Sequence, residues 1–213
     1  MGETAHGARI ENVVTHGTFS LDGGTWEVDN NVWIVGDDAE VIVIDPAHDP
    51  AAVAAAVGGR KTHAILLTHG HDDHIRAARE TADLLGAPLY LHPADRMLWD
   101  AVYDEEPDAQ IADGDVYAVA GVELHAKHTP GHSPGSVSFV APALGAVFTG
   151  DTLFQGGPGA TGRSYSSFET IIDSIRETLL VLPGETVVCT GHGDTTTIGD
   201  EAPHLDEWIA RGH

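Results

Sequence analysis

The sequence contains a single cysteine, Cys189, and few basic side chains. One thiol can form neither a disulfide framework nor a zinc site built from several cysteines. Ten Lys and Arg residues oppose 33 Asp and Glu residues, which gives a formal net charge of −23 with histidine neutral. A chain this acidic repels phosphate groups. We therefore expect neither nucleic acid nor an anionic membrane surface as a partner.

Long hydrophobic segments are missing as well. No apolar run approaches the roughly 20 residues that cross a bilayer. Residues 1–7 contain neither a basic stretch nor an apolar run, so we expect no secretory signal and a cytoplasmic location. The 213 residues are 42% hydrophobic and 20% charged, which is a globular balance. We expect one domain over residues 1–213, and its oligomeric state stays open.

Short β-type runs and helical patterns occur in both halves of the chain. The expected strands cover residues 9–19, 31–36, 40–45, 64–68, 115–120, 122–128, 136–140, 146–149 and 186–190. The expected helices cover residues 50–57, 73–85 and 204–211, together with a helix that runs from a Ser166–Glu169 capping box through Leu180. Strands that cluster in each half, with helices between and after them, predict an α/β fold of two mixed sheets packed face to face with helices outside.

Fourteen histidines, more than the Lys and Arg residues together, give the first indication of chemistry. Residues 68–74 read Thr-His-Gly-His-Asp-Asp-His and directly follow an expected buried strand. Four potential ligands within six residues, His69, His71, Asp73 and His74, can surround one or two metal ions without help from distant parts of the chain. The alternative is a solvated polar loop. The order of these residues after a buried strand favours metal.

Three later segments each place one potential ligand beside glycines, where backbone and ion can come close. His132 lies in Pro-Gly-His-Ser-Pro-Gly, Asp151 in Thr-Gly-Asp-Thr and His192 in Thr-Gly-His-Gly. Each segment alone is weak evidence, because Gly-His and Gly-Asp are common in turns. Together with residues 68–74 they supply imidazole and carboxylate ligands without a usable thiolate, which suits Zn²⁺, Mn²⁺ or Fe²⁺.

The order and spacing of these ligands resemble the metallo-β-lactamase fold superfamily over nearly the whole chain, from Asp45 to His192. The segments around His132 and Asp151 resemble the glyoxalase II-like hydrolases most closely. The resemblance implies a four-layer αββα sandwich, with two mixed sheets flanked by helices and a dinuclear metal site at the open edge. Longer glyoxalase II enzymes continue into a helical glutathione-binding domain. Only residues 193–213 follow His192 here, so we expect a short form without it.

The resemblance also implies a role for each ligand, in two groups that share one carboxylate. It assigns His69, His71 and His132 to the first ion, Asp73, His74 and His192 to the second ion, and Asp151 to both. Asp73 and Asp151 are the expected catalytic carboxylates. Asp45 is expected to hold the ligand loop from behind the metal ligands. An ordinary strand-end Asp before Pro46 is the alternative for that residue.

Two divalent ions, with zinc expected and iron or manganese as alternatives, share a water and lower its pKa from 15.7 toward about 7. The bridging hydroxide is then the expected nucleophile. True metallo-β-lactamases do not place a bridging carboxylate where Asp151 stands, which favours the thioesterase-like hydrolases. A thiolate with a pKa near about 8.5 leaves without a proton donor. We expect hydrolysis of a thioester of a low-molecular-weight thiol, with the thiol carrier left open. The alternatives are a mononuclear-iron persulfide dioxygenase and a lactone or phosphodiester hydrolase.

Arg163 is the best-placed cation for contacting such a substrate. It lies in the Gly-rich segment 154–164, between the Asp151 motif and the expected helix. Its planar guanidinium suits a carboxylate or a sugar hydroxyl of the thiol carrier. A structural role within its own loop is the alternative.

Overall fold

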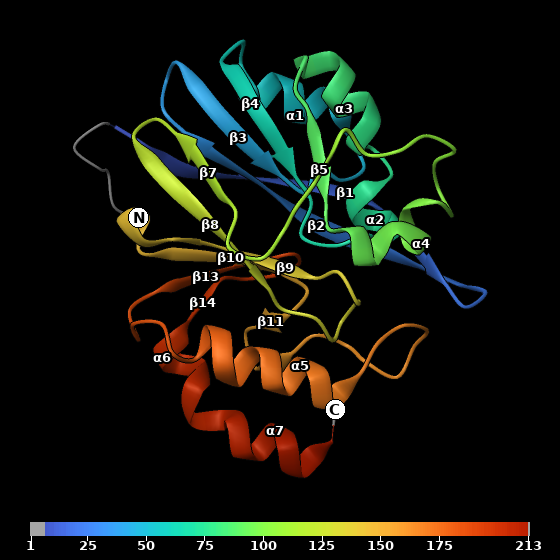
Figure 1. Ribbon diagram of the computed structural model, residues 1–213, viewed down its shortest axis with the longest axis vertical. Coiled ribbons are helices and arrows are strands. Elements are labelled where there is room, and N and C mark those ends of the chain that lie inside the picture. Colours follow the sequence, from blue (N-terminus) through green and yellow to red (C-terminus); the bar gives the residue numbers. More distant parts are fainter. Residues whose placement is uncertain (1–6, 213) are drawn as a thin grey trace.

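The computed structural model describes residues 7–212. Residues 1–6, which form most of the segment expected to lack a secretory signal, and residue 213 lie outside the described residues. Two six-stranded mixed sheets dominate the structure (Figure 1). In the first sheet the strands are hydrogen-bonded in chain order: β1 (Arg9–Leu21), β2 (Gly24–Gly36), β3 (Glu40–Ile44), β4 (Lys61–Leu66), β5 (Leu89–Leu91) and β6 (Ala109–Gln110). Strands β1 to β3 pair antiparallel, and β3 to β6 pair parallel.

The second sheet comes from the other half of the chain and has the order β14-β13-β10-β9-β8-β7. Its strands are β7 (Val116–Val119), β8 (Val122–His128), β9 (Val137–Ala141), β10 (Ala146–Gly150), β13 (Val187–Thr190) and β14 (Thr196–Thr197). Strands β10 and β13 pair parallel, whereas the other neighbours pair antiparallel. A small hairpin, β11 (Leu153–Phe154) with β12 (Gly157–Pro158), lies beside it.

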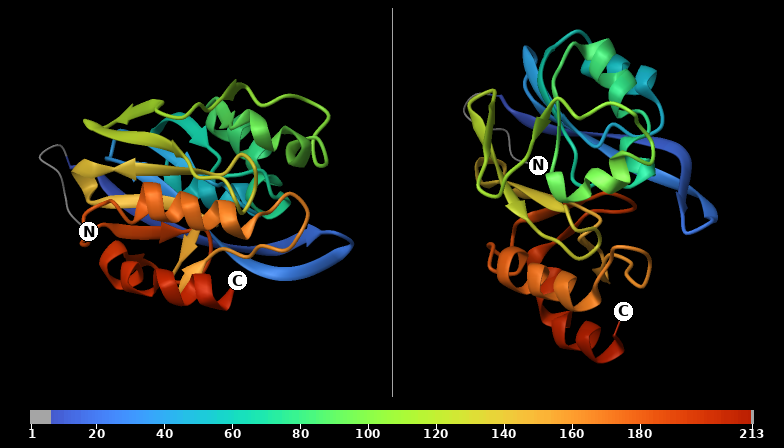
Figure 2. Two further views of the ribbon diagram at one scale, coloured as in Figure 1. Left: turned by 60° about the horizontal axis from the view of Figure 1, so that its bottom comes forward. Right: turned by 45° about the vertical axis from the view of Figure 1, so that its right-hand side comes forward.

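Helices cover the outer face of each sheet (Figure 2). The first sheet carries α1 (Pro50–Val57), α2 (Asp72–Ile75), α3 (Ala78–Leu85) and α4 (Arg96–Trp99). The second carries α5 (Phe168–Ser174), α6 (Ile198–Glu201) and α7 (Leu205–Arg211). Short turns complete the structure: the 3₁₀ turns η1 (Pro93–Asp95), η2 (Pro142–Leu144) and η4 (Ala202–His204), and the π-helical turn η3 (Ile175–Leu179).

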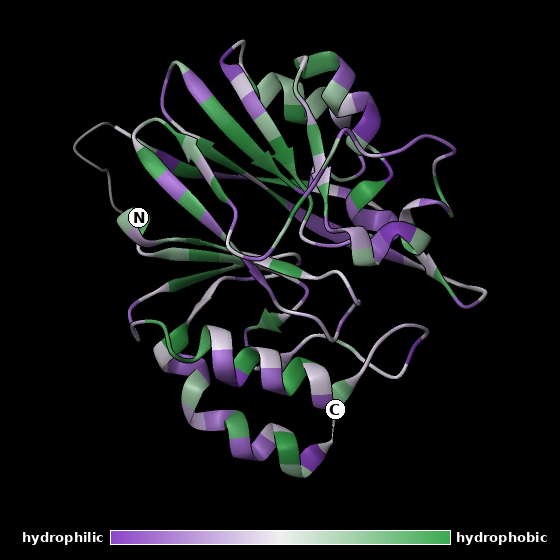
Figure 3. Ribbon diagram, in the orientation of Figure 1, coloured by the Kyte–Doolittle hydropathy of each residue, from purple (hydrophilic) through white to green (hydrophobic). Residues whose placement is uncertain are grey.

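Three layers of buried apolar side chains hold these elements together. The layer between the sheets includes Leu66, Phe139 and Phe148. A second layer joins the first sheet to its helices, and a third, with Trp208, joins the second sheet to α5 and α7. Figure 3 shows apolar and polar residues alternating along α5 and α7, as expected for helices with one buried face. This confirms the four-layer αββα sandwich. Among the described residues, no helix has the length and apolar character needed to span a bilayer.

The expected helix over residues 73–85 is wrong as a single element, because the chain forms α2 and α3 with a break at Arg76 and Ala77. The hydroxyl of Tyr103 lies 2.7 Å from the carbonyl oxygens of both Ile75 and Arg76. The single hydroxyl hydrogen of Tyr103 can serve one of these carbonyl oxygens at a time, in place of an N–H donor of a continuous helix. The sequence of the helix itself contains no signal for the break, since Tyr103 lies far along the chain.

The expected capping box is also wrong by one residue. Ser167 is the N-cap of α5, and its side chain accepts a hydrogen bond from the backbone N–H of Thr170. Ser166 instead donates to the carbonyl oxygen of Arg163 at 2.8 Å. The helix expected through Leu180 is α-helical only to Ser174 and continues as the π-helical turn.

Other boundaries differ where tertiary pairing decides them. Strand β2 begins at Gly24, well before the expected residue 31, because it pairs with β1 in unbroken register from Gly36 to Gly24. The short strands β5 and β6 and the helix α4 were not expected. Burial against neighbouring strands, more than local propensity, determines such short elements.

Candidate metal centre

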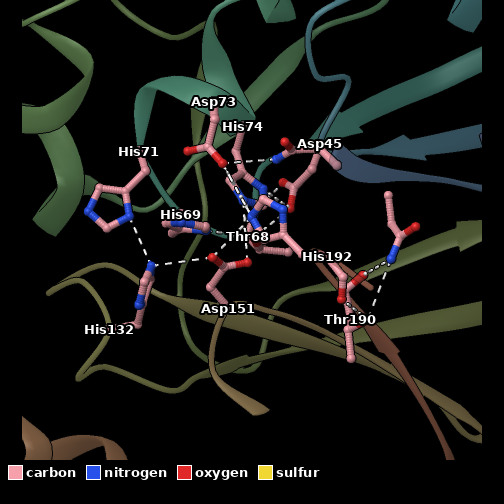
Figure 4. Close-up of polar contacts among 12 residues, drawn as sticks. Asp45, Thr68, His69, His71, Asp73, His74, His132, Asp151, Thr190 and His192 are labelled. Carbon is pink, nitrogen blue, oxygen red and sulfur yellow. Dashed lines mark hydrogen bonds and ion pairs between the residues drawn. The ribbon is translucent and has the colours of Figure 1, made fainter. Parts of the chain in front are cut away.

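The expected ligands converge where several strands end (Figure 4). The loop after β4 carries His69 and His71, β10 ends immediately before Asp151, and β13 ends two residues before His192. His132 lies on the connection between β8 and β9. Since β10 and β13 are parallel, their carboxyl ends meet at the same edge of the sheet, which is where open α/β sheets bind ligands.

The first donor group consists of His69, His71 and His132. One potential ligand atom from each lies within 4.8 Å of the others, and all three residues are buried. The Nδ1 atom of His71 lies 2.9 Å from Nε2 of His132. The Nε2 atom of His69 is buried without a hydrogen-bond partner among the described residues.

The second donor group consists of Asp73, His74 and His192, again with ligand atoms within 4.8 Å of one another. The Nε2 atoms of His74 and His192 lie 3.2 Å apart. The Oδ2 atom of Asp73 lies 3.2 Å from Nε2 of His192 and 3.5 Å from Nε2 of His74. This group therefore contains a carboxylate, unlike the first.

Asp151 lies between the two groups. Its Oδ2 is 3.5 Å from Nε2 of His132 and 3.3 Å from Nε2 of His192, while its Oδ1 is 3.3 Å from Nε2 of His74. Gly191 makes this approach possible, because a Cβ at that position would lie 2.1 Å from Asp151 Oδ1. The structure thus brings together all seven residues expected as ligands.

Outer contacts orient the imidazole rings so that Nε2 faces the centre in four of the five histidines. The Nδ1 atom of His132 donates to the carbonyl oxygen of Ala160 at 2.9 Å, and that of His192 donates to the carbonyl oxygen of Asp29 at 2.7 Å. The remaining Nδ1 contacts are His69 to Thr68 Oγ1 at 3.0 Å and His74 to Asp45 Oδ2 at 2.9 Å. Such partners fix the tautomer and the direction of metal-ligating histidines.

Asp45 lies behind the ligand loop, where the sequence places it. Its Oδ1 accepts a hydrogen bond from the backbone N–H of Thr68 at 2.7 Å, and its Oδ2 accepts from the Thr68 hydroxyl at 2.6 Å. The same Oδ2 accepts from His74. One buried carboxylate thus joins the start of the ligand loop to a ligand on α2.

Two asparagines next to the centre were missed by the sequence reasoning. Asn30 donates from Nδ2 to Asp73 Oδ2 at 3.0 Å, and its Oδ1 lies 2.7 Å from Nε2 of His48. Asn31 donates to the carbonyl oxygen of Thr190 and therefore holds the start of the His192 loop. Two adjacent amides at the entry to a buried apolar strand were the available signal, because buried polar side chains need partners.

The two groups differ in their electrostatics. Burial lowers the pKa of His71 to about 3, with the nearby His132 adding to the shift. Burial also lowers the pKa of His69 well below its ordinary value. Burial acts the same way on His192, but the negative charge of Asp151 and the hydrogen bonds to Asp151 and Asp73 together outweigh it and raise the pKa to about 10. The pKa of Asp73 falls to about 2, because the nearby His74 and His192 outweigh the opposing effect of burial.

These side chains fit divalent metal ions. Buried polar atoms without partners are rare in folded proteins, yet His69 Nε2 has no hydrogen-bond partner among residues 7–212, and Asp151 Oδ1 has only the 3.3 Å ion-pair contact with His74. Both atoms point into a cluster of nitrogen and oxygen ligands. Neutral imidazole and carboxylate suit Zn²⁺, Mn²⁺ and Fe²⁺, in agreement with the sequence.

A cavity of about 310 Å³ opens over this centre. Phe19, Trp26 and Phe154 form an aromatic wall, and Arg163 also lines the cavity. The Cζ atom of Arg163 lies 4.0 Å from the centre of the Trp26 ring, a cation–π distance. The next residue, Ser164, donates from its backbone N–H and its hydroxyl to the carboxylate of Asp22 at the tip of the β1–β2 hairpin. Arg163 is thus at the cavity, and its loop is attached to the hairpin.

Comparison with known proteins agrees with this geometry. The family profile of the Metallo-beta-lactamase superfamily matches residues 25–192. The hydroxyacylglutathione hydrolase GloC of Haemophilus influenzae is 32% identical over 181 residues, which cover 78% of this chain and 85% of GloC. The chain therefore spans most of the length of this relative.

Two solved structures share both sequence and fold with the chain. The BLEG-1 B3 metallo-beta-lactamase is 30% identical with a TM-score of 0.78, covering 90% of this chain and 98% of that one. TTHA1623 in a di-iron-bound form is 32% identical with a TM-score of 0.73, covering 86% of this chain and 96% of that one. From the matched profile, the shared fold and the two donor groups it follows that the chain belongs to the metallo-beta-lactamase superfamily of metallo-hydrolases.

Proposed function

We propose that this chain is a dinuclear metal-dependent hydrolase that cleaves a thioester of a low-molecular-weight thiol. The observation that carries the proposal is the place of Asp151, whose carboxylate contacts imidazoles of both donor groups. The similarity to GloC, which is named a hydroxyacylglutathione hydrolase, supports this substrate class. The di-iron-bound relative supports two ions.

The donor groups define which residues would hold the ions. His69, His71 and His132 would hold one, and Asp73, His74 and His192 the other, with Asp151 shared. When bound, a pair of divalent ions supplies Lewis acidity and makes a hydroxide nucleophile accessible near neutral pH.

The protein's own side chains orient the ligands and the substrate. Asn30 donates to Asp73 Oδ2, the same oxygen that lies 3.2 Å from Nε2 of His192, and so orients this carboxylate toward the centre. The aromatic wall of Phe19, Trp26 and Phe154 gives the cavity an apolar surface for the substrate. Among residues 7–212, the guanidinium of Arg163 contacts only the ring faces of Trp26 and Phe19, so its hydrogen-bond donors are available for a carboxylate of the substrate. The thiolate product leaves without a proton donor, since the pKa of its thiol is about 8.5.

Hydrolysis of β-lactams is the second candidate, because BLEG-1 is named a B3 metallo-beta-lactamase. The carboxylate of Asp151 between the donor groups favours the thioesterase class over this candidate. A panel of substrates separates the two directly.

The test uses metal-free protein that is reloaded separately with Zn²⁺, Mn²⁺ and Fe²⁺, with metal content measured by mass spectrometry. The substrates are S-lactoylglutathione, other acyl and formyl thioesters, a chromogenic cephalosporin, a homoserine lactone, a bis-phosphodiester, and glutathione persulfide with O₂. We expect about two ions per chain and the highest kcat/KM for a thioester, with Asp151→Asn as the inactive control.

Three results would overturn the proposal. Preferential turnover of the cephalosporin would assign a lactamase, and preferential turnover of the lactone or the phosphodiester would assign those classes. A single iron per chain, with O₂ consumption and sulfite production, would assign a persulfide dioxygenase.

A further inference from the structure

Asp95 is a buried carboxylate that belongs to neither donor group. It is the last residue of η1, between β5 and α4, and its side chain is 0% exposed. Its Oδ2 accepts hydrogen bonds from the backbone N–H of Gly70 at 2.8 Å and from the Ser133 hydroxyl at 2.6 Å. Its Oδ1 accepts from the backbone N–H of Gly135 at 2.5 Å. Every contact is one in which the carboxylate accepts.

These partners lie directly beside the ligands of the first donor group. Gly70 stands between His69 and His71, and Ser133 follows His132. The two loops meet at Asp95 on one side and at the 2.9 Å contact between His71 and His132 on the other. In the second donor group, no residue has a hydrogen bond to Asp95.

The fit around Asp95 leaves little space for adjustment. A Cβ at Gly135 would lie 2.7 Å from Asp95 Cγ, so the close approach of this loop requires glycine. An amide at position 95 can accept through one atom only. One of the two backbone N–H groups would then face an N–H donor instead of an acceptor, and the two loops would separate.

We propose that Asp95 is a positioning residue that sets the spacing between the His69–His71 loop and His132 and thereby the metal affinity of the first donor group. This proposal rests on the metal centre of the proposed function and does not depend on the thioester substrate. Residues behind the ligands of metal sites change metal affinity by about 10–100-fold when they are substituted.

The experiment titrates metal-free protein with Co²⁺ and follows the visible absorption of the bound ion, so no substrate is involved. Asp95→Asn is expected to weaken one of the two binding steps by about 10–100-fold and to leave the other unchanged. Two single-site backgrounds identify the affected ion. In His192→Ala, which keeps the first donor group, Asp95→Asn should weaken the remaining binding. In His132→Ala, which keeps the second, it should have no effect.

Glu201→Gln is the matched control. Glu201 is also a buried carboxylate, 3% exposed, and it accepts from the backbone N–H of Gly156 at 3.0 Å and from the Thr196 hydroxyl at 2.7 Å. Its substitution should lower the melting temperature without changing either Co²⁺ binding step. If Asp95→Asn does not fold, Ser133→Ala removes one of the three hydrogen bonds and should weaken the same step by a smaller factor.

Two outcomes would overturn the proposal. In the first, folded Asp95→Asn, or Ser133→Ala in its place, binds both ions with wild-type affinity. In the second, both binding steps weaken equally together with the melting temperature, which would reduce Asp95 to a structural residue like Glu201.

Discussion

The two donor groups of the metal centre use the same side chain, histidine, in opposite electrostatic surroundings. In the first group imidazoles contact one another, and burial lowers the pKa of His71 to about 3. In the second, Asp151 and Asp73 raise the pKa of His192 to about 10 against the effect of burial. The comparison teaches that the neighbouring carboxylates, and not burial, decide whether a buried imidazole holds a proton.

This difference has a consequence for metal binding. In the first group, burial keeps His69 and His71 neutral near neutral pH and ready to coordinate. The second group keeps protons on His74 and His192, between the carboxylates of Asp73 and Asp151, until a cation replaces them. Its ligands are thus held by charge as well as by outer hydrogen bonds such as that of His192 to Asp29, whereas the loops of the first group are held by the hydrogen bonds of Asp95.

The largest effect is expected from Asp151→Asn, since this residue contacts both groups. Substitution of a residue that only supports a metal ligand lowers metal affinity or activity by about 10–100-fold. Loss of a shared ligand should therefore lower activity by at least about 100-fold. Metal content should fall below the wild-type value while the circular dichroism spectrum remains, because asparagine has the same shape. Wild-type metal content and turnover in this variant would contradict the shared role.

His132→Ala and His192→Ala should each lose one ion, but with different effects on the metal-free protein. Removing His192 leaves the buried carboxylates of Asp73 and Asp151 without one positive partner. Removing His132 takes away only one contact to Asp151, the longest at 3.5 Å. We expect urea unfolding of metal-free His192→Ala to show a free energy of unfolding lower by about 1–3 kcal/mol than that of His132→Ala. Equal free energies of unfolding for the two variants would contradict the electrostatic difference between the two donor groups.

Proton release on metal binding sharpens the same comparison. Because the pKa of His192 is raised to about 10, it is protonated near neutral pH and must release a proton to coordinate. His71, with a pKa of about 3, is already neutral and releases none. The affinity of the second group should therefore rise about tenfold per pH unit for each proton released, and more steeply than that of the first group, where His69 and His71 release none. Zn²⁺ calorimetry in buffers that differ in ionisation enthalpy measures the number of protons that each group releases. The variants are His192→Ala, which keeps the first group, and His132→Ala, which keeps the second.

Arg163→Ala should raise KM by about tenfold and change kcat much less, because a contact with the substrate carboxylate is made equally in the ground and transition states. Ser164→Ala is the control, since it removes the hydroxyl hydrogen bond to Asp22 and leaves the guanidinium of Arg163 in place. An unchanged KM with a lower melting temperature in Arg163→Ala would instead assign it to anchoring its loop on Trp26.

The smallest effect is expected from Cys189→Ala. Cys189 is 2% exposed, and burial raises the pKa of its thiol to about 12, so no thiolate is available as a ligand in either group. Metal content should remain that of the wild type, with stability lower by about 1 kcal/mol for the lost sulfur. Metal analysis of the purified variant tests this, and a reduced content would place a thiolate in the centre.

Local spacing made much of the metal centre predictable. His69, His71, Asp73 and His74 follow one strand within six residues, and a loop that runs into a helix keeps such residues near one another. His132, Asp151 and His192 each follow the end of a strand and lie beside glycine. This pattern can be recognised in the sequence without knowledge of the strand order. The two-sheet architecture was predictable for the same reason, since buried strands show as apolar runs.

Other features depended on residues distant in sequence. At the break between α2 and α3, the hydroxyl of Tyr103 contacts the carbonyl oxygen of Ile75. The start of β2 depends on its pairing with β1. Asp95 and Asn30 looked like ordinary loop polar residues until the fold placed them beside the ligands.

The sequence alone determined the type of metal ligand, the succession of strands and helices, and the exclusion of a disulfide-based structure. These properties reside in residue chemistry and in spacings of a few residues. Only the tertiary structure decided that Asp151 contacts both groups, that Asp95 joins two ligand loops, and that Arg163 lies on Trp26. Contacts of a few ångströms between distant residues depend on how two sheets pack, and that packing is a property of the whole core.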